Sequence, residues 1–472
     1  MATRRLVVIG ADAAGMSAAH QAIRTARTHG NDLEVVALER TDHTSYSACG
    51  IPYWLAGDVD SPDDLVARTP EGHRERGVDL RMRHEVTAID TANRHVTVRS
   101  LDSDRGSNTD GDTDRGTEYR LDYDELLIAT GAEPIHPDWA RGIPGVLPVK
   151  TLDDGAAWQG LLADNPATAV VVGGGYIGME VAETFARLGI TTTLVTRGAQ
   201  PMAQSFEPHM GALIRKGLED AGVTVVPGTD VTGITEAPAG SGARLQVTAA
   251  DGSAYPADVV ALALGVRPRT QLAKDAGLPL GERGGLVPDA QQRVADGVWA
   301  AGDCCEVFDR ILNSHWYIPL GTHANRAGRV AGTVIGGGEA HFPGVLGTAI
   351  LRAGHAEVSR VGLRTDWLPQ LGLTDADVIT TTMESTTASG YMPESAPMAI
   401  WVMAERATGR LLGCQIVGGR GAAKRIDTAA TAMWNDMTVG DIALMDLSYA
   451  PPFSPVWDPV QIACRRLADQ LR

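Results

Sequence analysis

A glycine-rich turn between an apolar strand and a helix limits the fold of this chain more than any other stretch. The run Ala169-Val-Val-Val172 leads into Gly173-Gly-Gly175-Tyr-Ile-Gly178, and a helical pattern follows. Strand, turn and helix in this order form the fingerprint of a dinucleotide-binding βαβ unit, whose glycines permit a tight turn and the close approach of a pyrophosphate. We therefore predict a Rossmann-like domain that binds a pyridine nucleotide at this turn.

The end of the next strand indicates which pyridine nucleotide binds. Residues 191–195 form a strand pattern that ends in Thr196-Arg197, where NAD-binding proteins usually place an acidic residue. A guanidinium in place of that carboxylate favours a ribose 2′-phosphate. The sequence therefore predicts NADPH as the coenzyme, with NADH as the alternative.

A second unit of the same kind lies at the start of the chain. Residues 6–9 are apolar and lead through Gly10-Ala11-Asp12-Ala13-Ala14-Gly15 into a helical stretch over 16–28; a second apolar run over 33–38 ends in Glu39. Asp12 replaces the usual middle glycine, so this turn alone fits a nucleotide site or an ordinary helix start equally well. As a nucleotide site, it would place Glu39 on the ribose hydroxyls.

Three further strands end in glycine turns. Leu126 to Ile128 runs into Ala129-Thr130-Gly131, residues 259–264 close at Gly265, and Val298 to Ala301 runs into Gly302-Asp303. Two nucleotide units about 160 residues apart imply one tightly held and one exchanging dinucleotide. The Asp303 carboxylate is suited to the ribityl hydroxyls of a flavin, so the first unit is expected to hold FAD.

A lone cysteine follows the first βαβ unit, in Ser45-Tyr-Ser-Ala-Cys49-Gly-Ile-Pro-Tyr53. No second cysteine lies four or five residues away, so Cys49 cannot form a disulfide within this motif. The thiol is interpreted either as a redox centre or as a small buried hydrophobe, and we favour the redox centre. The adjacent Cys304 and Cys305 would bridge only through a strained ring, and are interpreted as buried spectators.

Charge and cysteine content exclude several classes of function. The 472 residues include 41 basic and 58 acidic ones, a formal net charge of −17, which argues against a nucleic-acid partner. Five scattered cysteines are typical of a reducing compartment, so a cytoplasmic protein is expected, and no apolar stretch approaches a membrane span. The acidic stretch over 100–118 is interpreted as a mobile hairpin loop and not as a calcium-binding loop.

The composition changes after about residue 344. Alternating strand patterns appear over 398–403 and 413–417, followed by helical stretches over 424–435 and 439–444, with no nucleotide motif. The prolines of the segment 446–459 prescribe an extended path. We expect a separate α+β domain here.

Taken together, these motifs resemble the pyridine nucleotide–disulfide oxidoreductases. The resemblance rests on Ser45-x-x-x-Cys49-Gly-x-Pro-Tyr53, on the turns at Gly131 and Gly302, and on Tyr449-Ala-Pro-Pro-Phe-Ser. It is nearest to the single-cysteine branch that contains coenzyme A-disulfide reductase (CoADR), NAD(P)H oxidases and persulfide reductases. It implies a glutathione-reductase-like α/β fold, with an FAD domain over 1–150 and 271–343, an NAD(P) domain over 151–270 and a dimerisation domain over 344–472.

The resemblance also implies roles for individual residues. Cys49 would exchange with a low-molecular-weight disulfide, and coenzyme A disulfide is the first candidate in this branch. Tyr449 and Tyr391, the latter with Met392 as a one-residue alternative, would come from the partner subunit of a homodimer. Gln21 and Arg24 match the helix residues that touch the coenzyme A nucleotide. Tyr176 would cover the flavin, with ordinary strand-to-helix packing as the alternative. Glu180 would face the nicotinamide, with a solvated position on the helix as the alternative.

Two departures from the family pattern bear on the substrate. Ala13 stands where peroxidases and water-forming oxidases carry a histidine, and Ala48 stands where known coenzyme A-disulfide reductases carry an asparagine. The alternatives are an NAD(P)H oxidase, a persulfide or polysulfide reductase and, in another class, a flavin-dependent redox-responsive binding protein. No metal site is expected. The residues expected to contact FAD or the pyridine nucleotide are Gly10, Ala13, Ala14, Gly15, Glu39, Arg40, Ser45, Thr130, Gly131, Gly173, Gly175, Tyr176, Ile177, Gly178, Glu180, Arg197, Gly265, Gly302 and Asp303.

Overall fold

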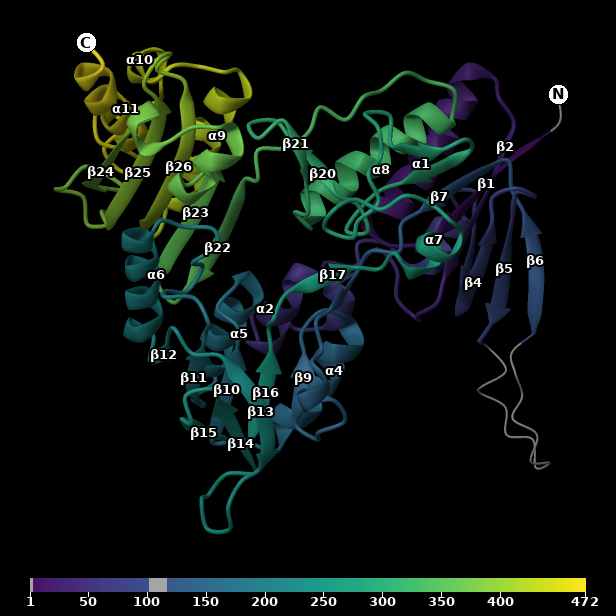
Figure 1. The fold of residues 1–472 in the computed structure, drawn as a ribbon, viewed down its shortest axis with the longest axis horizontal. Coiled ribbons are helices and arrows are strands. Elements are labelled where there is room, and N and C mark those ends of the chain that lie inside the picture. Colours follow the sequence, from purple (N-terminus) through teal and green to yellow (C-terminus); the bar gives the residue numbers. More distant parts are fainter. Residues whose placement is uncertain (1–2, 102–116) are drawn as a thin grey trace. The chain divides into compact units, whose positions relative to one another are not determined.

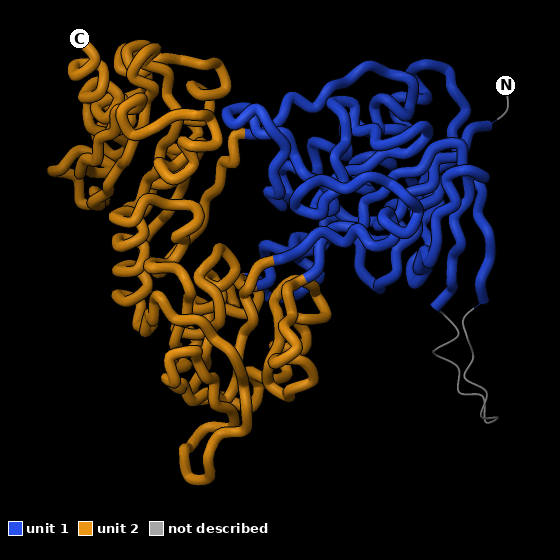
Figure 2. Tube along the Cα trace, viewed as in Figure 1, with its two compact units in different colours: residues 1–51, 59–133, 266–345 blue, residues 52–58, 134–265, 346–472 orange. Residues whose placement is uncertain are grey.

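The computed structural model describes residues 3–101 and 117–472, and the chain forms two compact units. The first unit comprises Met1–Ile51, Val59–Glu133 and Val266–Val345; the second comprises Pro52–Asp58, Pro134–Gly265 and Leu346–Arg472 (Figure 2). Most of the acidic stretch predicted as a loop, residues 102–116, lies outside the described residues.

A six-stranded sheet forms the core of the first unit (Figure 1). The four pairings from β19 to β3 are parallel, and β18 pairs antiparallel with β19 at this edge of the sheet. The strands are apolar and buried because a parallel sheet is covered on both faces. In spatial order they are β18 (Arg293–Ala295), β19 (Val298–Ala300), β7 (Glu125–Ile128), β1 (Arg4–Ile9), β2 (Leu33–Glu39) and β3 (Val78–Met82).

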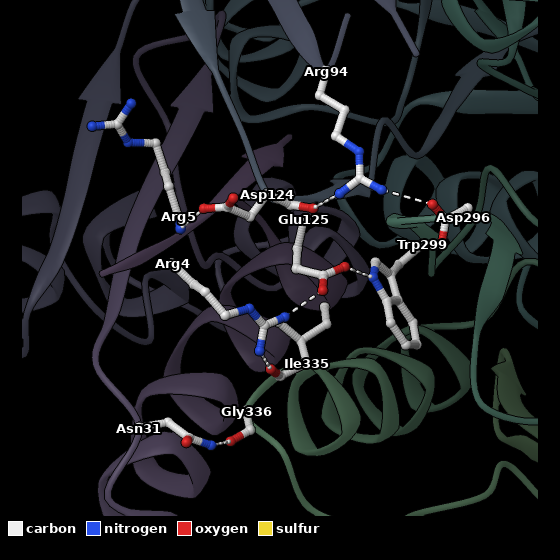
Figure 3. Close-up of polar contacts among 10 residues, drawn as sticks. All are labelled: Arg4, Arg5, Asn31, Arg94, Asp124, Glu125, Asp296, Trp299, Ile335 and Gly336. Atoms are coloured by element: carbon white, nitrogen blue, oxygen red, sulfur yellow. Dashed lines mark hydrogen bonds and ion pairs between the residues drawn. The ribbon is translucent and has the colours of Figure 1, made fainter. Parts of the chain in front are cut away.

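Polar side chains join the strands of this sheet at their amino ends. Glu125 accepts hydrogen bonds from Arg4 and, at 2.7 Å, from the indole Nε1 of Trp299, so one carboxylate links β1, β7 and β19 (Figure 3). Asp124 accepts a bond of 2.7 Å from the backbone N–H of Arg5. Because these contacts lie at the amino ends, the carboxyl ends remain available for the glycine turns.

Two helices pack closely beside this sheet, α1 (Ala13–His29) and α8 (Gly321–Ile335). A Cβ added at Gly332 would lie 2.2 Å from the backbone oxygen of Ala18, and one at Gly328 would lie 2.3 Å from that of Ala14. Only glycine therefore fits at these contacts on α8. A three-stranded antiparallel sheet completes the unit with β4 (His84–Asp90), β5 (His95–Ser100) and β6 (Glu118–Asp122).

The second unit begins with a five-stranded parallel sheet and an antiparallel sheet of three strands. The parallel strands are β12 (Thr224–Val226), β11 (Thr191–Val195), β10 (Thr168–Val172), β16 (Val259–Leu262) and β9 (Val146–Pro148), with α4 (Leu152–Ala163), α5 (Tyr176–Arg187) and α6 (Pro208–Asp220). The antiparallel strands are β13 (Val231–Glu236), β14 (Leu245–Ala249) and β15 (Ala254–Ala257). The two predicted Rossmann-like βαβ units are therefore confirmed.

The C-terminal part of the second unit is an antiparallel sheet with helices, as the sequence predicted. In spatial order its strands are β22 (Ala349–Ala353), β23 (Ala356–Gly362), β26 (Leu411–Gly418), β25 (Pro397–Glu405) and β24 (Val378–Thr386). Its helices are α9 (Ile426–Trp434), α10 (Val439–Ala443) and α11 (Pro459–Gln470).

Shorter elements connect these layers. They are η1 (Ala48–Gly50), α2 (Ile51–Leu55), η2 (Pro62–Leu65), α3 (Pro70–Arg74), β8 (Ala132–Pro134), η4 (Asp138–Ala140), β17 (Val266–Pro268), α7 (Gln271–Asp275), β20 (Val307–Asp309), β21 (Ser314–Trp316), η5 (Thr365–Leu371), η6 (Asp375–Asp377) and η7 (Ala423–Arg425). Within residues 3–101 and 117–472, no helix is both long and apolar enough to cross a membrane.

Candidate active site

The first glycine turn crosses the carboxyl ends of β1 and β7. Gly10 has φ 97°, and its N–H donates to the backbone oxygen of Leu38 at 2.9 Å. A Cβ at Gly10 would lie 2.3 Å from the oxygen of Ala129, and one at Gly15 would lie 1.9 Å from that of Gly10. The backbone therefore approaches its neighbours as closely as a nucleotide-binding turn requires, although Asp12 replaces one glycine.

Glu39 lies beside this turn, at the end of β2 as predicted. One oxygen of its buried carboxylate accepts a bond of 3.0 Å from the N–H of Ala11, and the other accepts bonds from the N–H and hydroxyl of Thr41 at 2.9 and 2.8 Å. These bonds fix the carboxylate next to the glycine turn. Its contact with a ribose remains a prediction.

Two more predicted turns face the same end of the sheet. Gly302 has φ 90°, and a Cβ there would lie 2.9 Å from the Cβ of Ala14. The hydroxyl of Thr130 donates to the backbone oxygen of Arg269 at 2.6 Å, and the N–H of Arg269 donates to the oxygen of Gly131 at 2.9 Å. Burial, followed by the nearby charge of Arg40, lowers the pKa of Arg269. Two neighbouring guanidiniums suit a diphosphate, and no motif in the sequence marked Arg269.

A buried phenol offers a further test of whether a flavin fits. The hydroxyl of Tyr317 is buried and has no hydrogen-bond partner among the described residues. Burial and the adjacent charge of Asp303 raise the pKa of Tyr317. A buried donor of this kind is costly unless a ligand completes its hydrogen bond. The glycine cradle, the fixed carboxylate of Glu39 and this hydroxyl fit a flavin dinucleotide.

The turn that carries Cys49 is held by a neighbouring segment. The N–H of Ser47 donates to the oxygen of Leu65, and the N–H of Ala67 donates to the oxygen of Ser45, both at 2.8 Å. A Cβ at Gly50 would lie 2.3 Å from a methyl group of Leu65, so this glycine sits directly against that side chain. Cys49 itself is exposed, in agreement with a reactive thiol and against the buried-hydrophobe interpretation.

The other four cysteines are buried. The sulfur atoms of Cys304 and Cys305 lie 3.8 Å apart without a disulfide, and Cys304 donates to the backbone oxygens of Ala301 and Ile128. Burial raises the pKa of Cys464 to about 12, and it also raises the pKa of Cys414 and of Cys305. These three thiols resist ionisation and are therefore poor nucleophiles. The hydrogen bond with Cys305 lowers the pKa of Cys304, but that thiol is buried.

The second glycine turn repeats the geometry of the first. Gly173 has φ 115°, and a Cβ there would lie 2.2 Å from the oxygen of Ala263; one at Gly178 would lie 1.9 Å from the oxygen of Gly173. A Cβ at Gly174 would lie 2.7 Å from the hydroxyl of Thr196. The end of β11 therefore packs against the turn, and the exposed Arg197 follows at once.

Helix α5 begins at this turn and carries Tyr176 and Glu180. Burial raises the pKa of the Tyr176 phenol. Burial, followed by the charge of Glu183, raises the pKa of Glu180 to about 7, while the Tyr53 hydroxyl and Arg352 act in the opposite direction. Arg352 pairs with Glu183 at 2.8 Å, and its guanidinium carbon lies 5.4 Å from the centre of the Tyr53 ring. Sequence reasoning missed Glu183 and Arg352, which no motif marks.

The two predicted catalytic tyrosines lie on neighbouring segments of the second unit. The N–H of Ser389 donates to the oxygen of Pro451 at 2.9 Å, and Arg425 donates to the oxygens of Thr387 and Phe453, both at 2.6 Å. These bonds join the segment before Tyr391 to the segment after Tyr449. Both tyrosines are exposed, by 75% and 45%.

A groove of about 400 Å³ lies on the first unit, where the sequence predicted a nucleotide of the substrate. It is lined by Gln21, Arg24, Thr25, Thr28, His29 and Arg329. Arg24 donates to the amide oxygen of Gln21 at 2.8 Å, so the two predicted residues lie side by side. Arg68 lies near both Arg76 and Arg24, because burial and then the charges of these two arginines lower the pKa of Arg68. The local sequence gave no signal for Arg68, Arg76 or Arg329.

The remaining predicted cofactor residues flank the same turns. Ala13 and Ala14 begin α1, Gly175 is the N-cap of α5, and Ile177 lies in the first turn of that helix. Arg40 follows β2, and Gly265, at φ 92°, follows β16. In the part of the chain that the structure describes, no cluster of three or more histidine, cysteine or acidic side chains could hold a metal ion.

Family models match most of the chain. The model of the pyridine nucleotide-disulphide oxidoreductases matches residues 4–326, and the model of their dimerisation domain matches residues 351–459. The first match includes Cys49 and both glycine turns, and the second includes Tyr391 and Tyr449. The predicted fold class, α/β with two Rossmann-like domains and an α+β dimerisation domain, is confirmed.

Individual relatives cover nearly the whole chain. An NADH oxidase of Methanocaldococcus jannaschii is 33% identical over 97% of both chains. An NAD(P)H coenzyme A polysulfide/persulfide reductase of Pyrococcus horikoshii is 33% identical over 98% of both chains. The solved structure of reduced CoADR-RHD from Bacillus anthracis is similar with a TM-score of 0.90 and 28% identity, over 100% of this chain and 81% of that chain.

Proposed function

Because this chain belongs to the pyridine nucleotide-disulphide oxidoreductase family, we propose that it uses FAD and NADPH to reduce a low-molecular-weight disulfide through Cys49, with coenzyme A disulfide as the first candidate. One observation carries the proposal. Cys49 is exposed in a turn held by two backbone hydrogen bonds, whereas the other four cysteines are buried. The reactive thiol of this oxidoreductase is therefore assigned to a single residue.

The proposed reaction is a thiol–disulfide exchange at Cys49. FAD, when bound, accepts the hydride of the nicotinamide and supplies two electrons to sulfur. The Cys49 thiolate attacks one sulfur of the substrate, forming a mixed disulfide and releasing one thiolate. Two electrons then cleave the mixed disulfide, which restores the Cys49 thiolate and releases the second substrate thiolate.

Tyrosine hydroxyls assist the departing thiolate in this proposal. Tyr449 and Tyr391 are exposed on adjoining segments, as needed if they act in the site of a second subunit. A phenol with a pKa around 10 is matched to a thiol and can donate a hydrogen bond or a proton to it. A homodimer whose two sites each combine Cys49 of one subunit with Tyr449 of the other follows from this assignment.

The groove on α1 supports an anionic substrate. Gln21 and Arg24 line it together with Arg329 of α8, and Arg68 lies nearby. Guanidiniums are the preferred partners of phosphate groups. Coenzyme A carries a phosphorylated nucleotide, so this groove supports coenzyme A disulfide over an uncharged disulfide.

The names of two relatives support two alternative enzyme activities. A persulfide or polysulfide reductase would use the same thiol, and the Pyrococcus horikoshii relative bears that name. An oxidase would pass electrons to oxygen, as the name of the Methanocaldococcus jannaschii relative implies for that protein. Ala13 favours disulfide reduction over a water-forming oxidase, because the histidine of such oxidases is missing. Very slow reoxidation of the reduced flavin by every disulfide and by oxygen would instead support the hypothesis of a redox-responsive binding protein.

The test is NADPH consumption by the FAD-containing protein, measured anaerobically with coenzyme A disulfide, glutathione disulfide and polysulfide, and separately with oxygen alone. We expect turnover with coenzyme A disulfide that Cys49→Ser abolishes while NADPH still bleaches the flavin. Removal of both Cys304 and Cys305 by serine or alanine should leave turnover largely intact. Normal turnover in Cys49→Ser, or oxygen consumption that exceeds reduction of every disulfide, would contradict the proposal.

A further inference from the structure

Two stacked histidines connect helix α1 to the turn of Cys49. The rings of His20 and His73 have centroids 5.0 Å apart and planes at 22°, and Nε2 of His20 lies 2.7 Å from Nδ1 of His73. The second ring nitrogen of His73, Nε2, lies 2.9 Å from the hydroxyl of Ser45. Three side chains from three segments thus form one hydrogen-bonded chain, and the proposed reaction gives no role to its two histidines.

The hydrogen-bonded chain of side chains ends at Ser45, which has an uncommon backbone conformation. Ser45 has φ 49°, in the left-handed region that few residues other than glycine occupy. Such conformations persist where the surrounding structure holds them. Ser45 opens the turn that carries Cys49 four residues later. A side-chain contact from the buried His73 is therefore placed where it fixes the start of this turn.

The surroundings keep both imidazoles neutral. Burial, and then the charges of Arg68 and Arg76, lower the pKa of His20 to about 4; Arg24 adds to this effect. Burial, His20 and the same two arginines lower the pKa of His73 to about 4. A neutral imidazole has one donor and one acceptor nitrogen, so the two hydrogen bonds must point the same way. Either His20 donates to His73 and His73 donates to Ser45, or Ser45 donates to His73 and His73 donates to His20.

We propose that His73, supported by His20, is a positioning residue that fixes Ser45 and thereby the geometry of the Cys49 turn. His73 acts through Ser45 and is not a catalytic residue. Without this support the turn samples several conformations, and a smaller fraction of molecules holds the thiol in its reactive position. The turnover part of the test rests on the proposed function, whereas the labelling part does not.

Two amide substitutions separate the two hydrogen bonds of His73. A glutamine amide reaches the position of the imidazole Nε2, and an asparagine amide reaches that of Nδ1. His73→Gln therefore keeps the bond to Ser45, and His73→Asn keeps only the bond to His20. We expect kcat for the disulfide to fall about tenfold in His73→Asn and to stay near that of the unaltered protein in His73→Gln. His84→Asn, which alters a half-buried histidine of β4, is the matched control.

A second readout needs no substrate. Iodoacetamide should label Cys49 in the reduced, FAD-containing protein because the other cysteines are buried, and Cys49→Ser gives the background. We expect labelling at pH 7 to be at least about threefold slower in His73→Asn than in His73→Gln, because a turn that samples several conformations holds the thiol in its reactive position in a smaller fraction of molecules. If coenzyme A disulfide proves to be no substrate, this difference remains and only the proposed function fails.

The same glutamine and asparagine substitutions can be made at His20, the other histidine of the pair. They test the proposal if the variants of the buried His73 lose FAD. His20 is only partly buried; His20→Gln keeps a group near Nε2, which faces His73, and His20→Asn does not. The same order is expected, with His20→Asn slower in labelling than His20→Gln. Equal labelling rates for Gln and Asn at the positions that retain FAD, or faster labelling with Asn, would overturn the proposal.

Discussion

At the scale of single residues, the carboxyl group of Glu180 shows how burial and neighbouring charges set the pKa of a side chain. Its helix position was predicted from the glycine fingerprint, but burial and Glu183 raise its pKa to about 7, and Arg352 opposes that shift. The group is therefore neutral below pH 7 and negative above it. In the predicted position facing the nicotinamide, its charge would act on the hydride donor.

A pH dependence of the hydride step follows. Loss of hydride leaves a positive nicotinamide, which a negative Glu180 stabilises, so the rate of anaerobic flavin reduction by NADPH should rise as pH increases through about 7. Stopped-flow absorbance measures this rate. Glu180→Gln should give a slow and pH-independent reaction. Arg352→Gln should move the midpoint upward, because Arg352 lowers the pKa of Glu180. Unchanged profiles in both variants would refute this role.

Arg197 is predicted to select the coenzyme. The structure packs Thr196 against Gly174 in the second turn, which puts the exposed Arg197 directly after the residue that contacts this turn. A charge-assisted bond of about 1.5–3 kcal/mol corresponds to a preference for NADPH of roughly tenfold or more in kcat/KM. Arg197→Glu should shift the preference toward NADH, whereas Arg244→Glu, on an exposed arginine of the same unit, should not. A preference for NADH in the unaltered protein would sink this prediction.

At the scale of elements, the helix pair α1 and α8 supports the first glycine turn, where FAD is proposed to bind. Glycines at 328 and 332 of α8 approach the backbone oxygens of Ala14 and Ala18, and Ala14 also belongs to the first turn. A Cβ on α8 would push α1 away from the sheet. The position of the first glycine turn therefore depends on a helix that begins about 300 residues later in the sequence.

Gly332→Ala should lower the Tm and weaken FAD binding. The added Cβ would lie 2.2 Å from a backbone oxygen, and overpacking of this kind costs about 1–3 kcal/mol. Thermal unfolding followed by the fluorescence of released flavin measures both effects. Gly160→Ala is the control: its Cβ would meet nothing within 4 Å in α4, so it should stabilise the helix by about 0.5–1 kcal/mol. Equal Tm values for the two variants would show that the close approach is unimportant.

At the scale of the whole molecule, the C-terminal part exposes large apolar side chains. Tyr391, Phe453, Leu444 and Val456 are 75%, 76%, 80% and 66% exposed, in a region that matches a dimerisation domain. A second copy of the chain would bury such side chains. Neither subunit alone would then contain a complete site.

Mixed dimers test the shared site. A heterodimer of a Cys49→Ser subunit and a Tyr449→Phe subunit should contain one site with both residues and one site with neither. Random reassembly of equal amounts should restore about a quarter of the sites. Disulfide turnover is measured after confirmed subunit exchange, with each variant alone as the baseline. Activity no greater than the sum of two defective variants would exclude a shared site.

The sequence by itself determined both nucleotide turns and the cysteine between them. Gly10 and Gly173 follow apolar strands at the expected positions, because glycine spacing and strand hydrophobicity are local properties of the chain. Glu39 likewise ends β2 where the second strand of a βαβ unit must end. The exposed Cys49 agrees with the motif around it.

Tertiary structure decided the features that combine distant segments. Which cysteines are buried, the contact between His73 and Ser45, and the raised pKa of Glu180 all depend on side chains far away in the sequence. Desolvation and charge act through space, so they are fixed only when the chain has folded. For this reason the spacing of residues predicted where the site lies, whereas packing set the ionisation and the rigidity of the groups within it.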